Sequence, residues 1–256
     1  MKIIDTHAHY NSKKFSADKK EILEKMQESC EIIVNVGTNT KSFKEITSLA
    51  KKYNFLYSVI GYFPCDVLEL EDKNNRDVFM EALEDPKTVA IGEIGLDYHW
   101  NTPAPEIQQK YFIEQIELAK KLNLPISIHS RDAEADTLKI IKDHYDENLK
   151  GVIHCYSYGL DSAKEYLDMG FYFGIGGTST YKGNDELRQV IEFLPIENIV
   201  LETDCPYLSP VPKRGKRNDS SNLIYVAENI ANIKGLSTQE VINITNQNAK
   251  KLYNLK

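Results

Sequence analysis

The chain has 256 residues, of which 41% are hydrophobic and 27% charged, and its formal net charge is −7 at pH 7. This composition supports a sizeable core, and the negative charge argues against a protein that coats nucleic acid through Lys and Arg alone. The four cysteines show no Cys-x-x-Cys spacing, and the chain has neither a secretory signal pattern nor an apolar run long enough to cross a bilayer. We therefore expect a cytoplasmic, monomeric protein with no membrane partner.

Eight short apolar runs, bounded by Gly, Pro or Asn, predict buried parallel strands. They are residues 3–4, 32–36, 56–60, 89–91, 126–128, 152–153, 171–175 and 199–201. Segments with apolar residues at helical spacing predict helices at 18–30, 106–123, 139–145, 161–169, 185–193, 221–233 and 237–253. The alternation predicts an α/β fold, and eight units in this length favour a (β/α)8 TIM barrel over an open sheet. We expect a single domain that spans residues 1–256.

Candidate metal ligands gather at the ends of the predicted strands, where barrels of this kind carry their active sites. Four of the six histidines lie there, together with one glutamate and one aspartate: His7, His9, His129, His154, Glu93 and Asp204. An isolated His-x-His pair is as often two ordinary strand-end residues as a pair of ligands. The joint pattern favours ligands, because imidazole and carboxylate groups together suit divalent ions such as Zn²⁺ or Mn²⁺.

Two of these residues have predicted catalytic roles. Two divalent ions roughly 3.5–4 Å apart can activate a water molecule and stabilise the oxyanions of a phosphoryl or acyl displacement. Glu93 is the candidate bridge between the ions. Asp204 is placed to bind one ion and to take the proton from the attacking water.

Several stretches, in order along nearly the whole chain, resemble the TatD family of metal-dependent deoxyribonucleases, within the amidohydrolase-like barrel superfamily. They are Ile4 to His9, Ile91 to Tyr98, Pro125 to Arg131, His154 to Ser157, Leu201 to Pro210, Arg214 to Asn218, and Asn248-Ala249. The resemblance implies a (β/α)8 barrel that removes nucleotides from DNA, chiefly 3′ to 5′, acting on a single strand or a 3′ end. It also implies two divalent ions per chain, with Mg²⁺ as the usual metal.

The resemblance also assigns ligands to each ion. It implies that His7, His9, Glu93 and Asp204 hold one ion, and that Glu93, His129 and His154 hold the second. The chain differs from the family at three places. It has Asn11 where an aspartate is usual, and Phe63 and Cys65 where the family has two histidines. These differences bear on substrate choice, whereas all six ligand positions are retained.

Three further residues are candidates for substrate binding. Arg131 lies two residues after His129 and is predicted to contact a phosphate, although pairing with Asp132 or another acid is an equal alternative. Arg217 belongs to a basic run with Lys213, Arg214 and Lys216 that follows the eighth strand, which favours contact with a nucleic-acid backbone. Tyr98 stands beside His99 and Trp100, where aromatic rings could stack on an unpaired base or simply cover apolar surface.

Two other functions stay open at this point. The barrel with its ions could hydrolyse an amide, a lactone or a small phosphoester, because the same arrangement serves many substrates. The chain could also be a metal-stabilised scaffold without catalysis. The retained Asp204 argues against the scaffold.

Overall fold

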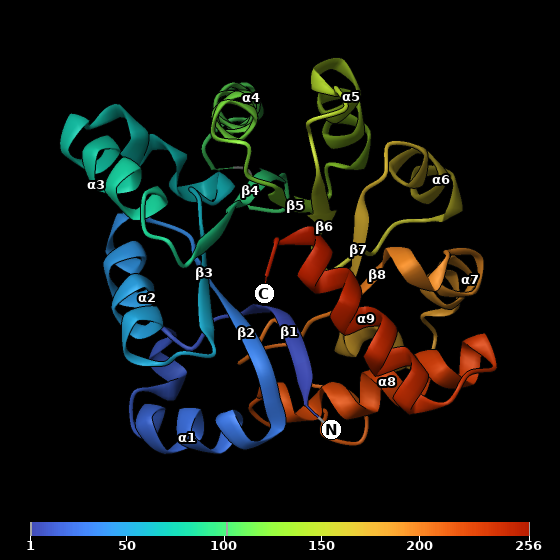
Figure 1. Ribbon diagram of the computed structural model, residues 1–256. Coiled ribbons are helices and arrows are strands. Elements are labelled where there is room, and N and C mark those ends of the chain that lie inside the picture. Colours follow the sequence, from blue (N-terminus) through green and yellow to red (C-terminus); the bar gives the residue numbers. More distant parts are fainter. Residues whose placement is uncertain (1, 101, 256) are drawn as a thin grey trace. The chain divides into compact units, whose positions relative to one another are not determined.

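The computed structural model describes residues 2–100 and 102–255, which form alternating strands and helices (Figure 1). The strands are β1 (Ile3–Ala8), β2 (Cys30–Gly37), β3 (Leu56–Ile60), β4 (Thr88–Asp97), β5 (Ile126–Arg131), β6 (Gly151–Ile153), β7 (Tyr172–Ile175) and β8 (Ile199–Leu201). The helices are α1 (Lys19–Ser29), α2 (Thr40–Lys52), α3 (Lys73–Leu83), α4 (Pro105–Leu122), α5 (Glu134–His144), α6 (Leu160–Asp168), α7 (Asp185–Phe193), α8 (Leu223–Lys234) and α9 (Thr238–Leu252). Among these described helices, none combines the length and apolar character needed to span a membrane.

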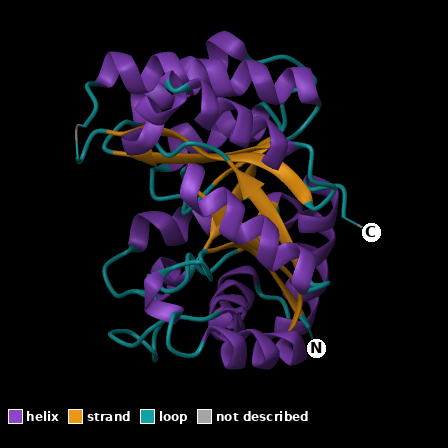
Figure 2. Cartoon of the chain, turned by 90° about the vertical axis from the view of Figure 1, so that its left-hand side faces the viewer, coloured by secondary structure: helices purple, strands orange, loops and turns teal. Residues whose placement is uncertain are grey.

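The fold is the (β/α)8 barrel that the sequence predicts. Its sheet contains the strands in chain order, from β1 to β8, each strand is followed by a helix, and the strand pairs with a described register are parallel. The chain divides into two compact units, one of Met1–Asn35 with Cys155–Lys256 and one of Val36–His154. In each unit, helices flank the strands (Figure 2). A single-domain organisation stays a prediction.

In the first unit, strand β1 is buried along its whole length because helices α8 and α9 pack against it. The buried Tyr253 hydroxyl, just after α9, donates a hydrogen bond to the Thr6 carbonyl at 3.3 Å. Helix α9 begins at a capping box, in which the Ser237 hydroxyl accepts from the Glu240 amide and the Glu240 carboxylate accepts from the Ser237 amide. The strand that carries His7 is therefore held rigidly from one side.

In the second unit, strand β4 is longer than the sequence predicts. It runs from Thr88 to Asp97, whereas the apolar pattern predicts only residues 89–91, so Glu93 lies inside the strand rather than after it. The extension pairs Gly95 with His129. Gly95 has a φ of 143°, and a Cβ atom there would lie 1.9 Å from the His129 carbonyl oxygen, so only glycine fits. The polar residues after the apolar run obscure this extension in the sequence.

Two helices of the second unit, α2 and α3, are missing from the sequence-based prediction. Helix α2 begins at a capping box between Asn39 and Ser42 and buries Phe43, among others. The Phe43 ring packs against Tyr62 and Phe79 with centroid distances of 5.0 and 5.6 Å, and Tyr62 and Phe79 are 5.2 Å apart. These three rings join both missing helices to the core of this unit.

Candidate functional site

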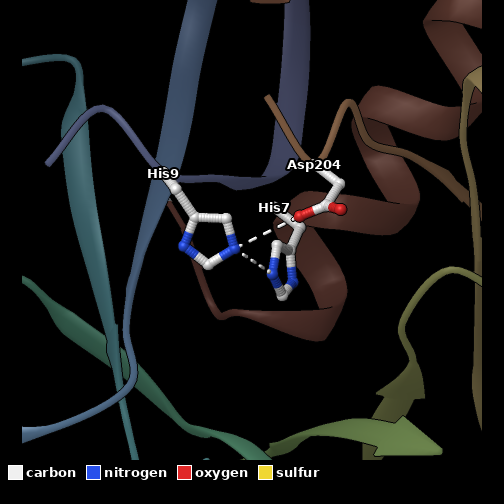
Figure 3. Close-up of side chains that lie close together, drawn as sticks. All are labelled: His7, His9 and Asp204. Carbon is white, nitrogen blue, oxygen red and sulfur yellow. Dashed lines mark hydrogen bonds and ion pairs between the residues drawn. The ribbon is translucent and has the colours of Figure 1, made fainter. Parts of the chain in front are cut away.

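Three of the predicted ligands converge in the first unit: His7, His9 and Asp204 (Figure 3). The Nε2 atoms of His7 and His9 are 3.2 Å apart, and His9 Nε2 is 3.2 Å from Asp204 Oδ1. One potential ligand atom from each residue lies within 4.8 Å of the other two. His7 is buried, whereas His9 and Asp204 are partly exposed, so water can reach the group.

The spacing of these atoms fits a divalent ion. Ligand atoms that each lie about 2.0–2.2 Å from a metal stand roughly 3.0–3.5 Å apart from one another. Two imidazole nitrogens and a carboxylate oxygen are also ligand types that Zn²⁺, Mn²⁺, Fe²⁺ and Co²⁺ accept. In donor type and spacing, this group of residues suits a metal.

The backbone brings Asp204 to the end of β1. The Asp204 amide donates to the His7 carbonyl at 2.9 Å, and the His9 amide donates to the Cys205 carbonyl at 2.8 Å. Ala8 and Cys205 form a parallel β-bridge at the same point. Asp204 itself has a φ of 53°, which turns the chain immediately after β8. The His-x-His pair and the aspartate are thus fixed by main-chain bonds rather than by side-chain contacts alone.

The buried carboxylate of Asp5 stabilises this arrangement through hydrogen bonds. Its oxygens accept hydrogen bonds from the Thr203 amide at 3.0 Å, the Thr203 hydroxyl at 2.6 Å and the Ser220 hydroxyl at 2.6 Å. Complete burial raises the pKa of Asp5 to about 7, although these hydrogen bonds act in the opposite direction. Asp5 therefore ties Thr203, the residue before Asp204, to the strand that carries His7.

The second unit holds another group, centred on His129. Its Nδ1 lies 2.8 Å from Glu93 Oε1, and its Nε2 lies 2.9 Å from Asp97 Oδ2. His154 Nε2 is 3.8 Å from the same Glu93 oxygen. Glu93 and Asp97 are both buried, and His129 is partly exposed. Three predicted ligands, Glu93, His129 and His154, therefore meet in this unit.

Electrostatics couple His129 to its two carboxylates. Burial lowers the pKa of His129, but the hydrogen bonds to Asp97 and Glu93 outweigh burial and leave the pKa above its usual value. Burial likewise raises the pKa of Asp97, yet the hydrogen bond from His129 and the amide of Trp100 together lower it below the usual range. Asp97 is therefore an ionised hydrogen-bond partner for Nε2 of His129.

Sequence reasoning missed Asp97. A carboxylate that binds the second nitrogen of a metal-ligating histidine orients the ring and fixes its tautomer. A signal exists in the sequence, because Glu93, Gly95 and Asp97 recur with a period of two and therefore share one face of a strand. This signal becomes informative only when strand β4 is known to extend to Asp97.

The predicted substrate-binding residues differ in their surroundings. Arg131 is exposed at the end of β5. Tyr98 donates its hydroxyl to Asp136 at 2.7 Å and accepts a hydrogen bond from Gln109 at 2.7 Å. Arg217 binds Asp18 through both terminal nitrogens, at 2.8 and 2.5 Å, and donates to the Lys14 carbonyl. Of the three, only Arg131 presents its side chain to solvent without such a set of hydrogen bonds among the described residues.

Asn11 belongs to the first unit, whereas the other two positions at which the chain differs from the family pattern, Phe63 and Cys65, lie near the second group. The Phe63 ring packs edge-on against the His129 ring, with a centroid distance of 4.6 Å. Burial, with help from the nearby carboxylates of Asp97 and Asp66, raises the pKa of the Cys65 thiol to about 11. Cys65 is therefore a neutral thiol rather than a thiolate ligand at neutral pH.

Comparisons with known proteins agree with this picture. A family model described as TatD related DNase matches residues 4–254. YabD of Bacillus subtilis, described as an uncharacterized metal-dependent hydrolase, is 39% identical over 254 residues, which cover 99% of each chain. The 3′-5′ ssDNA/RNA exonuclease TatD of Citrobacter koseri is 29% identical over 259 residues, again 99% of each chain. The crystal structure of YJJV, a TatD homolog from Escherichia coli K12, matches with a TM-score of 0.90 at 30% identity, covering 99% of this chain and 98% of that one.

The fold and the two groups of imidazoles and carboxylates define a metal-dependent hydrolase built on a (β/α)8 barrel. More narrowly, the chain belongs to the TatD related DNase family, since the family model matches almost its entire length. It is accordingly a hydrolase that acts on ester bonds.

Proposed function

We propose that the protein hydrolyses phosphodiester bonds in DNA and removes nucleotides from the 3′ end of a single strand. The observation that carries this proposal is the His7, His9 and Asp204 cluster, whose atoms have the spacing of metal ligands in a chain of the TatD related DNase family. The polarity and the preference for a single strand draw support from the Citrobacter koseri relative, which is named as a 3′-5′ ssDNA/RNA exonuclease.

Two divalent ions per chain are part of the proposal, with Mg²⁺ favoured by the family resemblance and Zn²⁺ or Mn²⁺ compatible with the ligands. His7, His9 and Asp204 would hold one ion. His129 and His154 would hold the other together with Glu93, which is also proposed as a ligand of the first ion. Divalent ions at such a site supply an acidified water molecule and offset the negative charge that develops on the phosphate.

Asp204 is proposed as the group that takes the proton from the attacking water. Its side chain is 19% exposed, so a water molecule can approach the carboxylate. The amide hydrogen bond from Asp204 to the His7 carbonyl fixes where that carboxylate stands. A base held within hydrogen-bonding reach of the water typically contributes about 10²- to 10⁴-fold to the rate.

Glu93 is the second proposed catalytic residue. Its side chain is only 6% exposed, and its Oε1 lies 2.8 Å from His129 Nδ1. This burial fixes the carboxylate in one place and leaves it little freedom to rotate away. Its proposed task is to hold the ions, and through them the water and the phosphate, in a constant geometry.

Arg131 is the most accessible of the three proposed substrate-binding residues. It is exposed and stands two residues beyond His129 on the same strand, where a guanidinium could bind a phosphate oxygen pair. Tyr98 and Arg217 remain proposed substrate contacts, but their polar groups already bind Asp136 and Asp18. Binding of DNA by either would require exchange of these hydrogen bonds.

Hydrolysis of a small ester, amide or phosphoester is a second candidate function. The observation that favours it is the Phe63 ring against His129, because an apolar ring there narrows the site beside a proposed ligand. A metal-stabilised scaffold is the third candidate. A cytoplasmic location and a monomeric state stay part of the proposal, to be checked by cell fractionation and by light scattering.

The deciding experiment follows DNA length after metal removal and replacement. Protein treated with EDTA is mixed with 5′-labelled single-stranded DNA and given Mg²⁺, Mn²⁺ or Zn²⁺. We expect stepwise shortening from the 3′ end only with added metal, and a loss of about 10²- to 10⁴-fold in rate for Asp204→Asn. Asp168→Asn, an exposed aspartate at the end of α6, is the matched control and should keep full activity.

Two results would contradict the proposal. Failure of every metal to shorten DNA, combined with turnover of a nitrophenyl ester or phosphoester, would assign the site to small substrates. If the protein turns over none of these substrates and Asp204→Asn lowers only the thermal stability, the protein would be a metal-stabilised scaffold.

A further inference from the structure

One side chain near the second group is unusually exposed. Trp100, in the loop after β4, is 63% exposed, and no other large hydrophobic side chain among the described residues exceeds 47%. A single exposed hydrophobic side chain is common on protein surfaces and does not by itself indicate a binding site. Trp100 is of interest because of the residues around it, which connect it to the second group of proposed ligands.

The backbone of Trp100 is tied to the proposed metal site. Its amide donates a hydrogen bond to Asp97 Oδ1 at 3.1 Å. The other oxygen of the same carboxylate lies 2.9 Å from His129 Nε2. One buried carboxylate thus connects the backbone of an exposed indole to a proposed metal ligand, and places the indole at the carboxyl end of β4.

A cation stands beside the indole. The guanidinium carbon of Arg131 is 6.0 Å from the centre of the Trp100 ring. In the parallel register of strands β4 and β5, the backbone of Arg131 lies opposite that of Asp97, two residues beyond His129. His99 meets the Trp100 ring edge-on, with an interplanar angle of 86°. The arrangement combines a flat aromatic surface with an exposed guanidinium next to a proposed metal ligand, His129.

We propose that Trp100 and Arg131 form a subsite for the end of a single strand, in which the indole stacks on an unpaired nucleobase and the guanidinium binds an adjacent phosphate. Aromatic side chains recognise single strands in this way because every base offers a π face, whereas in a duplex these faces are covered. Arginine suits the neighbouring position because its planar fork matches phosphate oxygens. The proposal deepens, and rests on, the proposed nuclease function.

The chain offers a direct probe, because Trp100 is its only tryptophan. Metal-loaded protein is titrated with a phosphorothioate-linked oligothymidylate, which resists hydrolysis, and the tryptophan fluorescence is recorded. We expect saturable quenching by the single strand and far less by a blunt duplex of the same length. Arg131→Gln should shift the quenching curve to higher oligonucleotide concentration.

Binding of a fluorescein-labelled oligonucleotide gives the second readout. Trp100→Ala should weaken it about 10- to 100-fold, whereas Trp100→Phe, which keeps a flat ring, should recover most of the affinity. Tyr145→Ala is the matched control. Tyr145 is 41% exposed in the same unit, but it precedes β6 and so lies toward the amino ends of the strands. Its replacement should leave binding unchanged.

The outcomes separate this subsite from the nuclease function itself. If wild-type protein and Trp100→Ala shorten single-stranded DNA with the same kcat/KM, and quenching is absent, the subsite is refuted while the nuclease function stands. If quenching occurs and Trp100→Ala weakens binding but natural DNA is never shortened, the nuclease function fails and strand binding at the indole stands.

Discussion

Replacing Asp97 with Asn tests whether the carboxylate behind His129 supports metal binding. The Asp97 side chain is buried, and its Oδ2 lies 2.9 Å from His129 Nε2. Asparagine has nearly the same size and preserves the packing, and its oxygen can still accept the Trp100 amide. What is lost is the negative charge and one acceptor oxygen, because the NH2 group of asparagine that would then face His129 Nε2 cannot accept its proton.

The expected magnitude follows from the role of such partners. Asp97 holds a proton on Nε2 of His129, which leaves Nδ1, the nitrogen that faces Glu93 at 2.8 Å, as the ligand atom. Loss of a partner of this kind typically lowers metal affinity or activity about 10- to 100-fold, which corresponds to about 1.4–2.8 kcal/mol. Because the Asp97 side chain is only 1% exposed and water cannot easily replace it, we expect the loss of Mn²⁺ affinity to lie toward the upper end of this range.

Calorimetric titration with Mn²⁺ measures the effect, with Asp136→Asn as the matched control. Asp136 also accepts a hydrogen bond at 2.7 Å, from Tyr98, but it touches no proposed ligand. Thermal unfolding without metal checks that the Asp97 variant is folded. The reasoning is refuted if Asp97→Asn binds Mn²⁺ as tightly as the wild type while Glu93→Gln weakens binding.

Three further predictions concern stability and reactivity. In urea titrations, Gly95→Ala should lower the free energy of unfolding by on the order of 3 kcal/mol, because its Cβ would lie 1.9 Å from the His129 carbonyl oxygen. The loss should be clearly larger than for Gly183→Ala, where φ is 82° and the space is open. Equal losses would contradict the close approach. Thr203→Val should cost about 1–3 kcal/mol by removing the hydroxyl that donates to Asp5 at 2.6 Å, and an unchanged urea midpoint would disprove that bond. The pKa of the Cys65 thiol is raised to about 11, which favours the neutral thiol. At pH 8, native Cys65 should therefore react with iodoacetamide about 100-fold more slowly than Cys65 in unfolded protein, as measured by peptide mass spectrometry. Similar rates in the two states would contradict the raised pKa.

The sequence allows prediction of the site because its ligands obey two simple rules. Side chains alternate along a strand, so His7 and His9 share a face, and strand ends carry the functional groups in a barrel. These rules require only local pattern and strand order. The structure then adds the atomic contacts: Asp204 meets His9 through its side chain and His7 through its amide.

Contacts that depend on register or on distant pairing are outside the reach of these rules. Asp97 meets His129 because β4 continues six residues beyond its apolar run, which Gly95 allows. Arg217 binds Asp18, 199 residues earlier in the chain, and no local pattern indicates this ion pair. The basic run around Arg217 predicts a phosphate contact from composition alone, and composition carries no information about partners.

The missing helices have different causes. Helix α2 has a recognisable start at Asn39 and buries Phe43 and Ile46 at helical spacing, so its signal was present. Helix α3 buries only residues near its carboxyl end, Phe79, Ala82 and Leu83, and its first turns are polar. Tertiary packing against the rings of the second unit, rather than periodicity, stabilises that helix.

Anomalous diffraction from crystals soaked in Mn²⁺ tests the central claim most directly. We predict one anomalous peak within roughly 2.0–2.3 Å of Nε2 of His7, Nε2 of His9 and a carboxylate oxygen of Asp204. A second peak should lie at the same range from Glu93 and from Nδ1 of His129. Peaks bound only by other residues, with these imidazoles free of metal, would contradict the proposed metal sites and the hydrolytic mechanism built on them.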